Sequence, residues 1–247
     1  MDFNLSNYQI LENLKKIIGK ILNWRGVYGR DFKRSYSQCG EDLIMDFIFG
    51  QIGVSRPSYI DIGAHHPYYL NNTALFSQRG ARGINVEPDP YLFGNFVKKR
   101  PNDINLNVGV GEKNGQMDFY IMSTPTMNTF SKEGADDLVA NFNFTIKEVR
   151  STPLLDINTI LNKYHEGKFP DLLSLDVEGL DEQIIRSIDL ERNFPKVICI
   201  ETTSYSETGN GIKNNSLIEL ISSQGYTNYA DTYINTIFIK ENLLKKT

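Results

Sequence analysis

A short apolar run that ends in an acid, a glycine and a small residue constrains this chain more than any other feature. It spans residues 58–67 and reads Ser-Tyr-Ile-Asp-Ile-Gly-Ala-His-His-Pro. A run of this kind, rich in Ile and Tyr and closed by Gly and Pro, predicts a buried strand that leads into a tight loop. In an open α/β sheet, ligands bind outside the carboxyl ends of the strands, where a glycine lets the backbone approach them. We therefore expect Gly63 and Ala64 to form a binding loop, with Asp61 at the last position of the strand.

A second apolar run ends in an acid about one strand-helix-strand unit later. Residues 83–88 read Gly-Ile-Asn-Val-Glu-Pro, so Glu87 follows the predicted strand. A carboxylate in this position is suited to bind both hydroxyls of a ribose. The first loop lacks the Gly-x-Gly-x-x-Gly fingerprint of dinucleotide-binding proteins, which argues against a close pyrophosphate contact and against a nicotinamide oxidoreductase. A nucleoside with a sulfonium and an amino-acid tail fits this loop better, which points to S-adenosylmethionine (SAM).

Seven sequence blocks, in this order and spacing, resemble those of a known family. They are residues 37–42, 59–67, 83–88, 103–110, 128–131, 173–179 and 197–201. Through them the chain resembles FkbM-type SAM-dependent methyltransferases over roughly residues 35–240. The resemblance implies an α/β fold of the class I methyltransferase type, a Rossmann-like sheet that is mostly parallel and ends in a C-terminal antiparallel hairpin. We assign this hairpin to two predicted strands, residues 227–230 and 234–240.

The resemblance also places residues around the cofactor. It implies that Ser37 and Gln38 lie against the methionine end of SAM, and that the segment from Asn107 to Gly109 lies beside the adenine. Glu41 and Asp42 follow directly, and capping of a helix N-terminus alone explains them equally well. The predicted cofactor-binding residues are Ser37, Gln38, Asp61, Gly63, Ala64, Glu87, Pro88, Asn107, Val108 and Asp176.

Methyl transfer to an alcohol needs a group that removes the hydroxyl proton, because an alcohol is a poor nucleophile at neutral pH. His65 and His66 follow the predicted cofactor loop, and a neutral imidazole accepts a proton at cellular pH. We favour His66 slightly as the base, because it lies one residue farther from Gly63 and next to a pair of tyrosines. The structural alternative, that these histidines cap the following loop, stays open.

Asp176 and Glu178 follow a strand that we expect beside the first one, which brings them to the same edge as the histidines. They complete the candidate catalytic set, with Asp176 orienting either the base or the cofactor. Carboxylates and an imidazole at one edge also suit a divalent cation, with His65, Asp176 and Glu178 as candidate ligands. No compact ligand motif fixes such a metal site. Capping of the next helix is the alternative role of Glu178.

Composition argues against some classes of binding partner and cellular location. The 247 residues are 40% hydrophobic and carry a net charge of −4 without an extended basic stripe, which argues against a nucleic-acid partner. Cys39 and Cys199 lack metal-ligand spacing, so we interpret them as reduced cytosolic thiols with structural roles. The sequence contains neither a secretory signal nor a run of eighteen apolar residues, and we expect a cytoplasmic protein without stable membrane insertion.

Two parts are expected along the chain. Residues 1–34 form an amphipathic helix, within 7–24, and a loop, while residues 35–247 form the methyltransferase domain. The helix packs on its own domain or on a second subunit, which would give a homo-oligomer, and a membrane surface is the alternative. Residues 123–153 are a polar and aromatic insertion, which we interpret as a substrate lid, with a surface hairpin as the alternative. Before it, residues 104–110 are predicted to form one strand.

The expected function follows mainly from the resemblance. It implies a SAM-dependent O-methyltransferase that acts on a hydroxyl of a sugar, either a nucleotide-linked sugar or a precursor of a surface polysaccharide or glycan. Polar and aromatic residues around Tyr68, Tyr69 and Asn128 support this weakly. Two alternatives stay open: a catalytically silent SAM-binding module, and a methyltransferase that acts on a small molecule other than a carbohydrate.

Overall fold

The structure is a computed structural model that describes residues 14, 16–19, 33–177, 179–206 and 211–244. The chain divides into two units, Met1–Arg34 and Ser35–Thr247. In the first unit, residues 14 and 16–19 are helical and residues 33–34 are not, and the rest of the predicted amphipathic helix lies outside the described residues. Within the part of the chain that is described, no helix has both the length and the apolar character needed to cross a bilayer.

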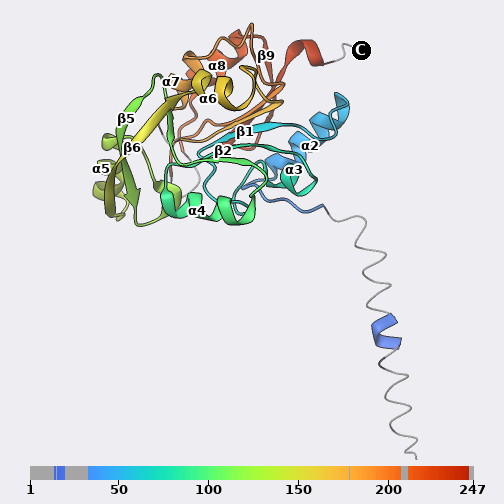
Figure 1. Cartoon of the computed structure of the whole chain (residues 1–247), viewed down its shortest axis with the longest axis horizontal. Helices are drawn as coiled ribbons and strands as arrows, with labels where there is room; N and C mark the ends of the chain where they lie inside the picture. Colours follow the sequence, from blue (N-terminus) through green and yellow to red (C-terminus); the bar gives the residue numbers. More distant parts are fainter. Residues whose placement is uncertain (1–13, 15, 20–32, 178, 207–210, 245–247) are drawn as a thin grey trace, which may run out of the picture. The chain divides into compact units, whose positions relative to one another are not determined.

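A seven-stranded sheet lies at the centre of the second unit (Figure 1), with the strand order β3-β2-β1-β7-β8-β10-β9. The strands are β1 (Tyr59–Ile62), β2 (Gly83–Val86), β3 (Ile104–Leu106), β7 (Leu172–Leu175), β8 (Val197–Glu201), β9 (Tyr226–Asp231) and β10 (Asn235–Lys240). β1 pairs in parallel with both β2 and β7, and β7 pairs in parallel with β8. β10 is antiparallel to its neighbours β8 and β9. The predicted mostly parallel sheet with a C-terminal antiparallel hairpin is therefore confirmed.

Helices pack on both faces of this sheet, and one more, α5, packs on the second sheet described below (Figure 1). They are α2 (Glu41–Gln51), α3 (Ala74–Gln78), α4 (Pro90–Lys99), α5 (Lys132–Asn141), α6 (Ile157–Tyr164), α7 (Asp181–Arg186) and α8 (Asn215–Ser223), with short 3₁₀ helices η1 (Pro125–Met127) and η2 (Glu241–Leu243). Side-chain oxygens of Asp89, Ser131, Asp156 and Asn214 accept hydrogen bonds from the first turns of α4, α5, α6 and α8. Each such cap contributes about 1 kcal/mol, so these four helix starts are fixed locally by the sequence.

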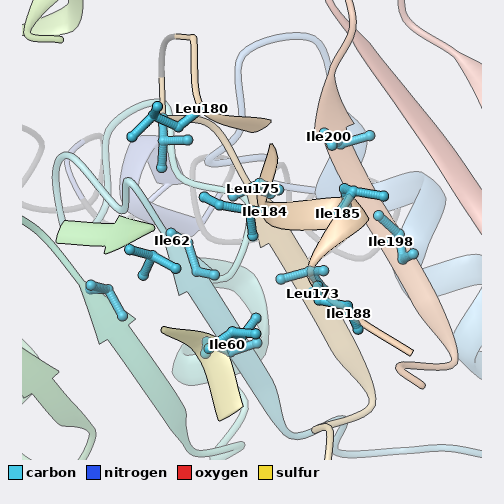
Figure 2. Close-up of a cluster of buried hydrophobic side chains, with 14 of the residues drawn as sticks. Ile60, Ile62, Leu173, Leu175, Leu180, Ile184, Ile185, Ile188, Ile198 and Ile200 are labelled. Carbon is cyan, nitrogen blue, oxygen red and sulfur yellow. The ribbon is translucent and has the colours of Figure 1, made fainter. Parts of the chain in front are cut away.

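The alternation of side chains along the central strands builds two cores. Ile60 and Ile62 of β1 pack with residues of α6, α7 and α8 on one face. Figure 2 shows this face, where the neighbouring strands, α7 and the turn after α7 supply Leu173, Leu175, Ile198, Ile200, Ile184, Ile185 and Ile188. Tyr59 points to the opposite face, where α2 and α3 contribute Met45, Ile48, Phe49 and Phe76. Each fully buried side chain of this size contributes roughly 1.5–3 kcal/mol, so burial on both faces fixes the register of β1.

A second, three-stranded sheet follows the first half of the main sheet. Its order is β4-β6-β5, from β4 (Gly109–Gly111), β5 (Gly115–Met122) and β6 (Ile146–Asp156). β6 pairs in parallel with β4 and antiparallel with β5, while α5 packs against Tyr120 and Met122 of β5 through Ala135 and Leu138. The polar and aromatic segment 123–153 thus contains η1, α5 and most of β6, outside the main sheet.

Two sequence-based boundaries were wrong. The single strand predicted over residues 104–110 is two strands, because β3 pairs with β2 and β4 pairs with β6 of the second sheet. Gly109 permits this change of partner, since a Cβ there would lie 2.3 Å from the ring of Phe130. β1 also ends at Ile62, so Asp61 is not its last residue.

Candidate active site

A cavity of about 330 Å³ opens at the carboxyl ends of the central parallel strands. Gly63, Glu87, Asp176 and Glu201 line it from the ends of β1, β2, β7 and β8. Residues 125–128 of the η1 region and residues 203–206 after β8 also line it. The cavity therefore lies where open α/β sheets bind ligands.

Gly63 fits a position that no other residue can occupy without a shift of the backbone. Its φ is +76°, and a Cβ would lie 1.7 Å from the backbone oxygen of Asp176. The N–H groups of Gly63 and Ala64 donate to the carbonyl of Val86 at 3.0 and 3.1 Å. The loop thus packs closely against the ends of β2 and β7, which explains why the sequence has a glycine at position 63.

Glu87 is a buried acid with both carboxylate oxygens engaged. Its Oε2 accepts from the backbone N–H of His65 at 2.7 Å, and its Oε1 accepts from that of Asp89 at 2.8 Å. Loss of hydration outweighs these two hydrogen bonds and, with the nearby negative charge of Asp89 and Asp61, raises the pKa of Glu87 to about 8. Each oxygen keeps acceptor capacity, so the carboxyl can bind hydroxyl groups that enter the cavity.

Two asparagine side chains hydrogen-bond to the segment of the cavity wall that carries Glu87. Asn107 Nδ2 donates to the carbonyls of Glu87 and Pro88 at 2.8 and 2.9 Å. Asn128 Nδ2 donates to Asp89 Oδ2 at 2.9 Å, and its Oδ1 accepts from the backbone of β5. Glu87, Pro88 and Val108 all line the cavity, whereas Asn107 acts on the backbone that carries them. Asp89 is a residue that sequence reasoning missed, although an Asp-Pro pair before a helix is a recognisable cap signal.

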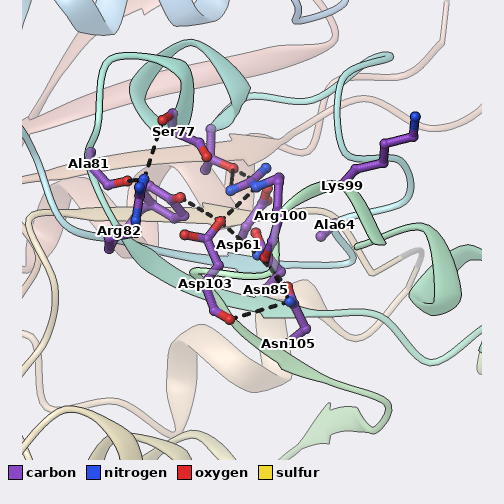
Figure 3. Close-up of polar contacts among 12 residues, drawn as sticks. Asp61, Ala64, Ser77, Ala81, Arg82, Asn85, Lys99, Arg100, Asp103 and Asn105 are labelled. Atoms are coloured by element: carbon purple, nitrogen blue, oxygen red, sulfur yellow. Dashed lines mark hydrogen bonds and ion pairs between the residues drawn. The ribbon is translucent and has the colours of Figure 1, made fainter. Parts of the chain in front are cut away.

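Asp61 lies in a buried polar network rather than among the residues that line the cavity. Its Oδ2 accepts from Asn71 Nδ2 at 3.0 Å and from Thr73 Oγ1 at 2.7 Å. Arg100 binds the same two side chains at 3.1 and 3.0 Å and forms an ion pair with Asp103 at 2.7 Å (Figure 3). Burial raises the pKa of Asp61, which Arg100 and the hydrogen bonds counteract in part. Its binding of the cofactor stays a prediction.

The two residues predicted at the methionine end of the cofactor lie differently. Gln38 lines the cavity, whereas Ser37 Oγ donates to Asp42 Oδ1 at 3.0 Å. Asp42 also accepts from the backbone N–H of Tyr36 at 2.7 Å, and Glu41 accepts from Cys39 N at 2.8 Å. The buried acids at the start of α2 therefore hold the segment that carries Gln38.

The two adjacent histidines differ in their position and their hydrogen bonds. His65 lines the cavity with a φ of +53°, and burial lowers its pKa. His66 Nδ1 accepts from the backbone N–H groups of Tyr68 and Tyr69 at 3.1 and 3.0 Å. These contacts place its proton on Nε2, so His66 caps the following loop in the neutral form. Its pKa is lowered by burial and by Lys99.

Asp176, which follows β7, and Glu201, at the end of β8, both line the cavity. The third predicted acid of this edge, Glu178, lies outside the described residues. Among the residues that the structure describes, no group of three or more His, Cys, Asp or Glu side chains is arranged to hold a metal ion. Metal dependence through His65, Asp176 and Glu178 stays a prediction. Glu201 was not predicted as a site residue, although it ends a strand in the same way as Asp176.

Comparisons with known proteins identify a family for this chain. The profile of the methyltransferase FkbM domain matches residues 61–227. No curated protein shows a significant match. A solved TehB-like SAM-dependent methyltransferase from Corynebacterium glutamicum is 12% identical, with a TM-score of 0.42, over 90% of this chain and 96% of its own. Magnesium protoporphyrin IX methyltransferase from Synechocystis PCC 6803, solved with bound SAM, is also 12% identical, with a TM-score of 0.36, over 96% and 98%.

The family match carries the assignment, since it covers more than half of the chain and includes the loop after β1, the acid after β2 and the end of β7. It supports SAM as the cofactor. The residues present fit this ligand, because the backbone of Gly63 lines the cavity and Glu87 offers a carboxyl for a ribose. From the profile match and the strand order together, we conclude that this chain belongs to the FkbM methyltransferase family.

Proposed function

We propose that this protein is a SAM-dependent O-methyltransferase whose acceptor is a hydroxyl of a sugar, carried by a nucleotide or by a glycan precursor. The observation that carries the proposal is the cavity itself. One of its sides has the glycine and the acid suited to SAM, and the other is lined by residues from η1 and from the segment after β8. Bound SAM supplies a methyl group on a sulfonium, which is an electrophile for a hydroxyl oxygen.

The cofactor side is built from rigid parts. Glu87 holds the ribose hydroxyls, since its carboxyl is fixed by two backbone N–H groups and keeps free acceptor capacity. Val108 lies beside the adenine, and Gln38 lies at the amino-acid end. These roles extend the sequence predictions to groups that line the cavity.

The acceptor side combines polar and aromatic groups. Thr126, Asn128, Ser204 and Tyr205 line it, and Tyr205 makes edge-to-face contacts with Phe142 and Phe144 of the insertion at 5.2 and 5.8 Å between ring centroids. Hydroxyl and amide groups offer hydrogen bonds to a sugar, while an aromatic ring offers an apolar surface to its C–H groups. This lining supports a carbohydrate acceptor, with the insertion as part of its binding site.

Titration calorimetry tests the cofactor first. We expect micromolar binding of SAM and no binding of NAD. In Glu87→Ala, loss of the hydrogen bonds made by this carboxyl should weaken SAM binding by about 1–3 kcal/mol. Unchanged affinity in this variant would remove Glu87 from the ribose site, and absence of SAM binding by the native chain would point to a silent module.

The acceptor requires a screen. Nucleotide sugars and oligosaccharide precursors are incubated with SAM carrying a labelled methyl group, and labelled products are identified by mass spectrometry. We expect label on a sugar oxygen. Transfer only to a non-carbohydrate small molecule, a protein or a lipid would contradict the proposed acceptor while leaving the methyltransferase assignment intact.

A further inference from the structure

Acidic side chains, rather than basic ones, line the cavity. Glu87, Asp176 and Glu201 supply carboxyls, whereas the lining contains neither Lys nor Arg among the residues that the structure describes. The undescribed residues 178 and 207–210 are Glu and Glu-Thr-Gly-Asn in the sequence, so neither residue type occurs there. A carboxyl is negative when ionised and neutral when protonated. In neither form does it supply the cation that a phosphate group binds most strongly.

The backbone N–H groups of the loop after β1 are already used within the chain. Those of Gly63 and Ala64 donate to the carbonyl of Val86 at 3.0 and 3.1 Å. The next one, of His65, donates to Glu87 Oε2 at 2.7 Å. Dinucleotide-binding folds place a pyrophosphate against the N–H groups of the corresponding loop and helix start. Here acceptors of the chain itself take these N–H groups, so the loop is a poor site for a diphosphate.

Acids of the chain also accept from the helix starts beside the cavity. Asp89 Oδ1 accepts from the N–H groups of Tyr91 and Leu92 at 2.7 and 3.3 Å, at the start of α4. After β7, Asp181 Oδ1 accepts from the N–H of Val177 at 3.2 Å. Leu92 and Val177 line the cavity. A carboxylate in such a place occupies the position that the anion of a ligand would take.

A lysine close to the acceptor side is held by an acid. Lys213 is the antiparallel bridge partner of Thr203, which lines the cavity. Its Nζ donates to Asp231 Oδ1 at 2.8 Å and to the carbonyl of Tyr233 at 2.6 Å. A phosphate would have to compete with both partners for this ammonium. Lys213 therefore does not compensate for the acids of the wall.

We propose that the acceptor sugar enters this cavity without a phosphate attached to it, as a residue of a neutral glycan or glycoside, and that nucleotide-linked sugars are rejected. The inference rests on the proposed methyl transfer to a sugar and chooses between the two carriers named there. SAM has a net positive charge, because it carries a sulfonium and an ammonium but only one carboxylate. Acids in the wall thus attract the cofactor and repel a diphosphate.

Matched pairs of acceptors test this inference. Each sugar is supplied both as a nucleoside diphosphate and as a neutral glycoside, with SAM carrying a labelled methyl group and with EDTA present. We expect kcat/KM for the glycoside to be at least about tenfold higher, because like charges in contact weaken binding. Raising the salt concentration from about 0.1 to 1 M shortens the Debye length from about 10 to 3 Å. Residual transfer to the nucleotide form should then increase relative to the glycoside.

A binding measurement needs no acceptor. Uridine diphosphate is titrated by calorimetry into the native chain saturated with S-adenosylhomocysteine, and we expect a Kd above about 1 mM. Thr126→Lys adds an ammonium to the wall of the cavity and should tighten this binding at least about tenfold. Glu112→Lys adds a lysine at an exposed site outside the lining and is the control, which should bind as weakly as the native chain. The native titration decides the question even if Thr126→Lys fails to fold.

Two results would overturn the proposal. One is a native chain that prefers the nucleotide form of a sugar, either with EDTA or after addition of Mg²⁺ or Mn²⁺, since a metal could bridge phosphates to the acids. The other is micromolar binding of uridine diphosphate by the native chain under either condition. Transfer to neither form of any sugar by a chain that binds SAM would contradict the proposed function instead. The titration would still decide whether the cavity accepts a phosphate-bearing ligand.

Discussion

Two groups of acidic side chains near β1 differ in what holds them. In the group around Arg100, the acid Asp103 is 2.7 Å from the guanidinium, and the side chains of both are about 1% exposed. At the cavity, Glu87 is held by backbone N–H groups, and Asp176 lines the same cavity as Glu201. The comparison teaches that burial alone does not define a site. A carboxylate paired with a buried cation stabilises the fold, whereas a carboxyl without such a pair keeps its capacity for a hydroxyl or a proton.

The largest effect is expected where the cavity loop meets β7. Gly63→Ala introduces a Cβ that would lie 1.7 Å from the backbone oxygen of Asp176, at a φ of +76°. We expect loss of measurable SAM binding together with a lower melting temperature, as seen by calorimetry. Gly94→Ala in α4 is the matched control, since no atom lies within 4 Å of the added Cβ. There alanine should stabilise the helix by roughly 0.5–1 kcal/mol. Native SAM affinity in Gly63→Ala would show that the loop adapts.

Substitution of Arg100 should lower the stability of the protein. Arg100→Met leaves Asp103 buried without its cation and should lower the free energy of unfolding by about 3–5 kcal/mol in urea denaturation. The control is Arg79→Met, which breaks an exposed ion pair with Asp46 and should cost about 0–1 kcal/mol. Equal effects of the two variants would contradict a special contribution of the buried network to stability.

Glu87 should make stability depend on pH in the opposite sense to a salt-bridged acid. Its pKa is raised to about 8 in the folded protein from an ordinary 4.5, so between these values the folded state binds more protons than the unfolded state. Stability should therefore fall as pH rises from about 5 to 8, by up to ~1.4 kcal/mol per pH unit from this group. Glu87→Gln should flatten the slope in urea denaturation, whereas Glu112→Gln should not. An identical slope in both variants would show that Glu87 is ionised throughout.

The smallest effect is expected at the contact between the insertion and the segment after β8. Phe142 and Tyr205 meet edge to face at 5.2 Å between ring centroids. A double-mutant cycle with Phe142→Leu and Tyr205→Leu should give a coupling of about 0.5–1.5 kcal/mol in the free energy of unfolding. The matched cycle replaces Phe142 and Tyr229 of β9, an exposed tyrosine without a recorded contact to Phe142 among the described residues, and should give none. Additivity in the first cycle would mean that the two segments are independent.

The sequence by itself determined the parts whose causes are local. The run 58–63 fixed a buried strand and a loop that only glycine fits, and the acid at Glu87 fixed the end of the next strand. Short apolar runs that end in an acid predicted the central strands. Together with the order of the blocks, these signals were sufficient for the fold and the family.

Only the tertiary structure decided which side chains reach the cavity. Asp61 and Asp176 look alike in sequence, since each ends an apolar run. The alternation along β1 turns Asp61 toward Asn71 and Thr73, however, and the position after β7 leaves Asp176 at the cavity beside Glu201. The split of residues 104–110 between two sheets is equally nonlocal, because it depends on which strand lies beside each half. Local patterns determine where strands begin and end, but the role of an acid depends on partners that are distant in sequence.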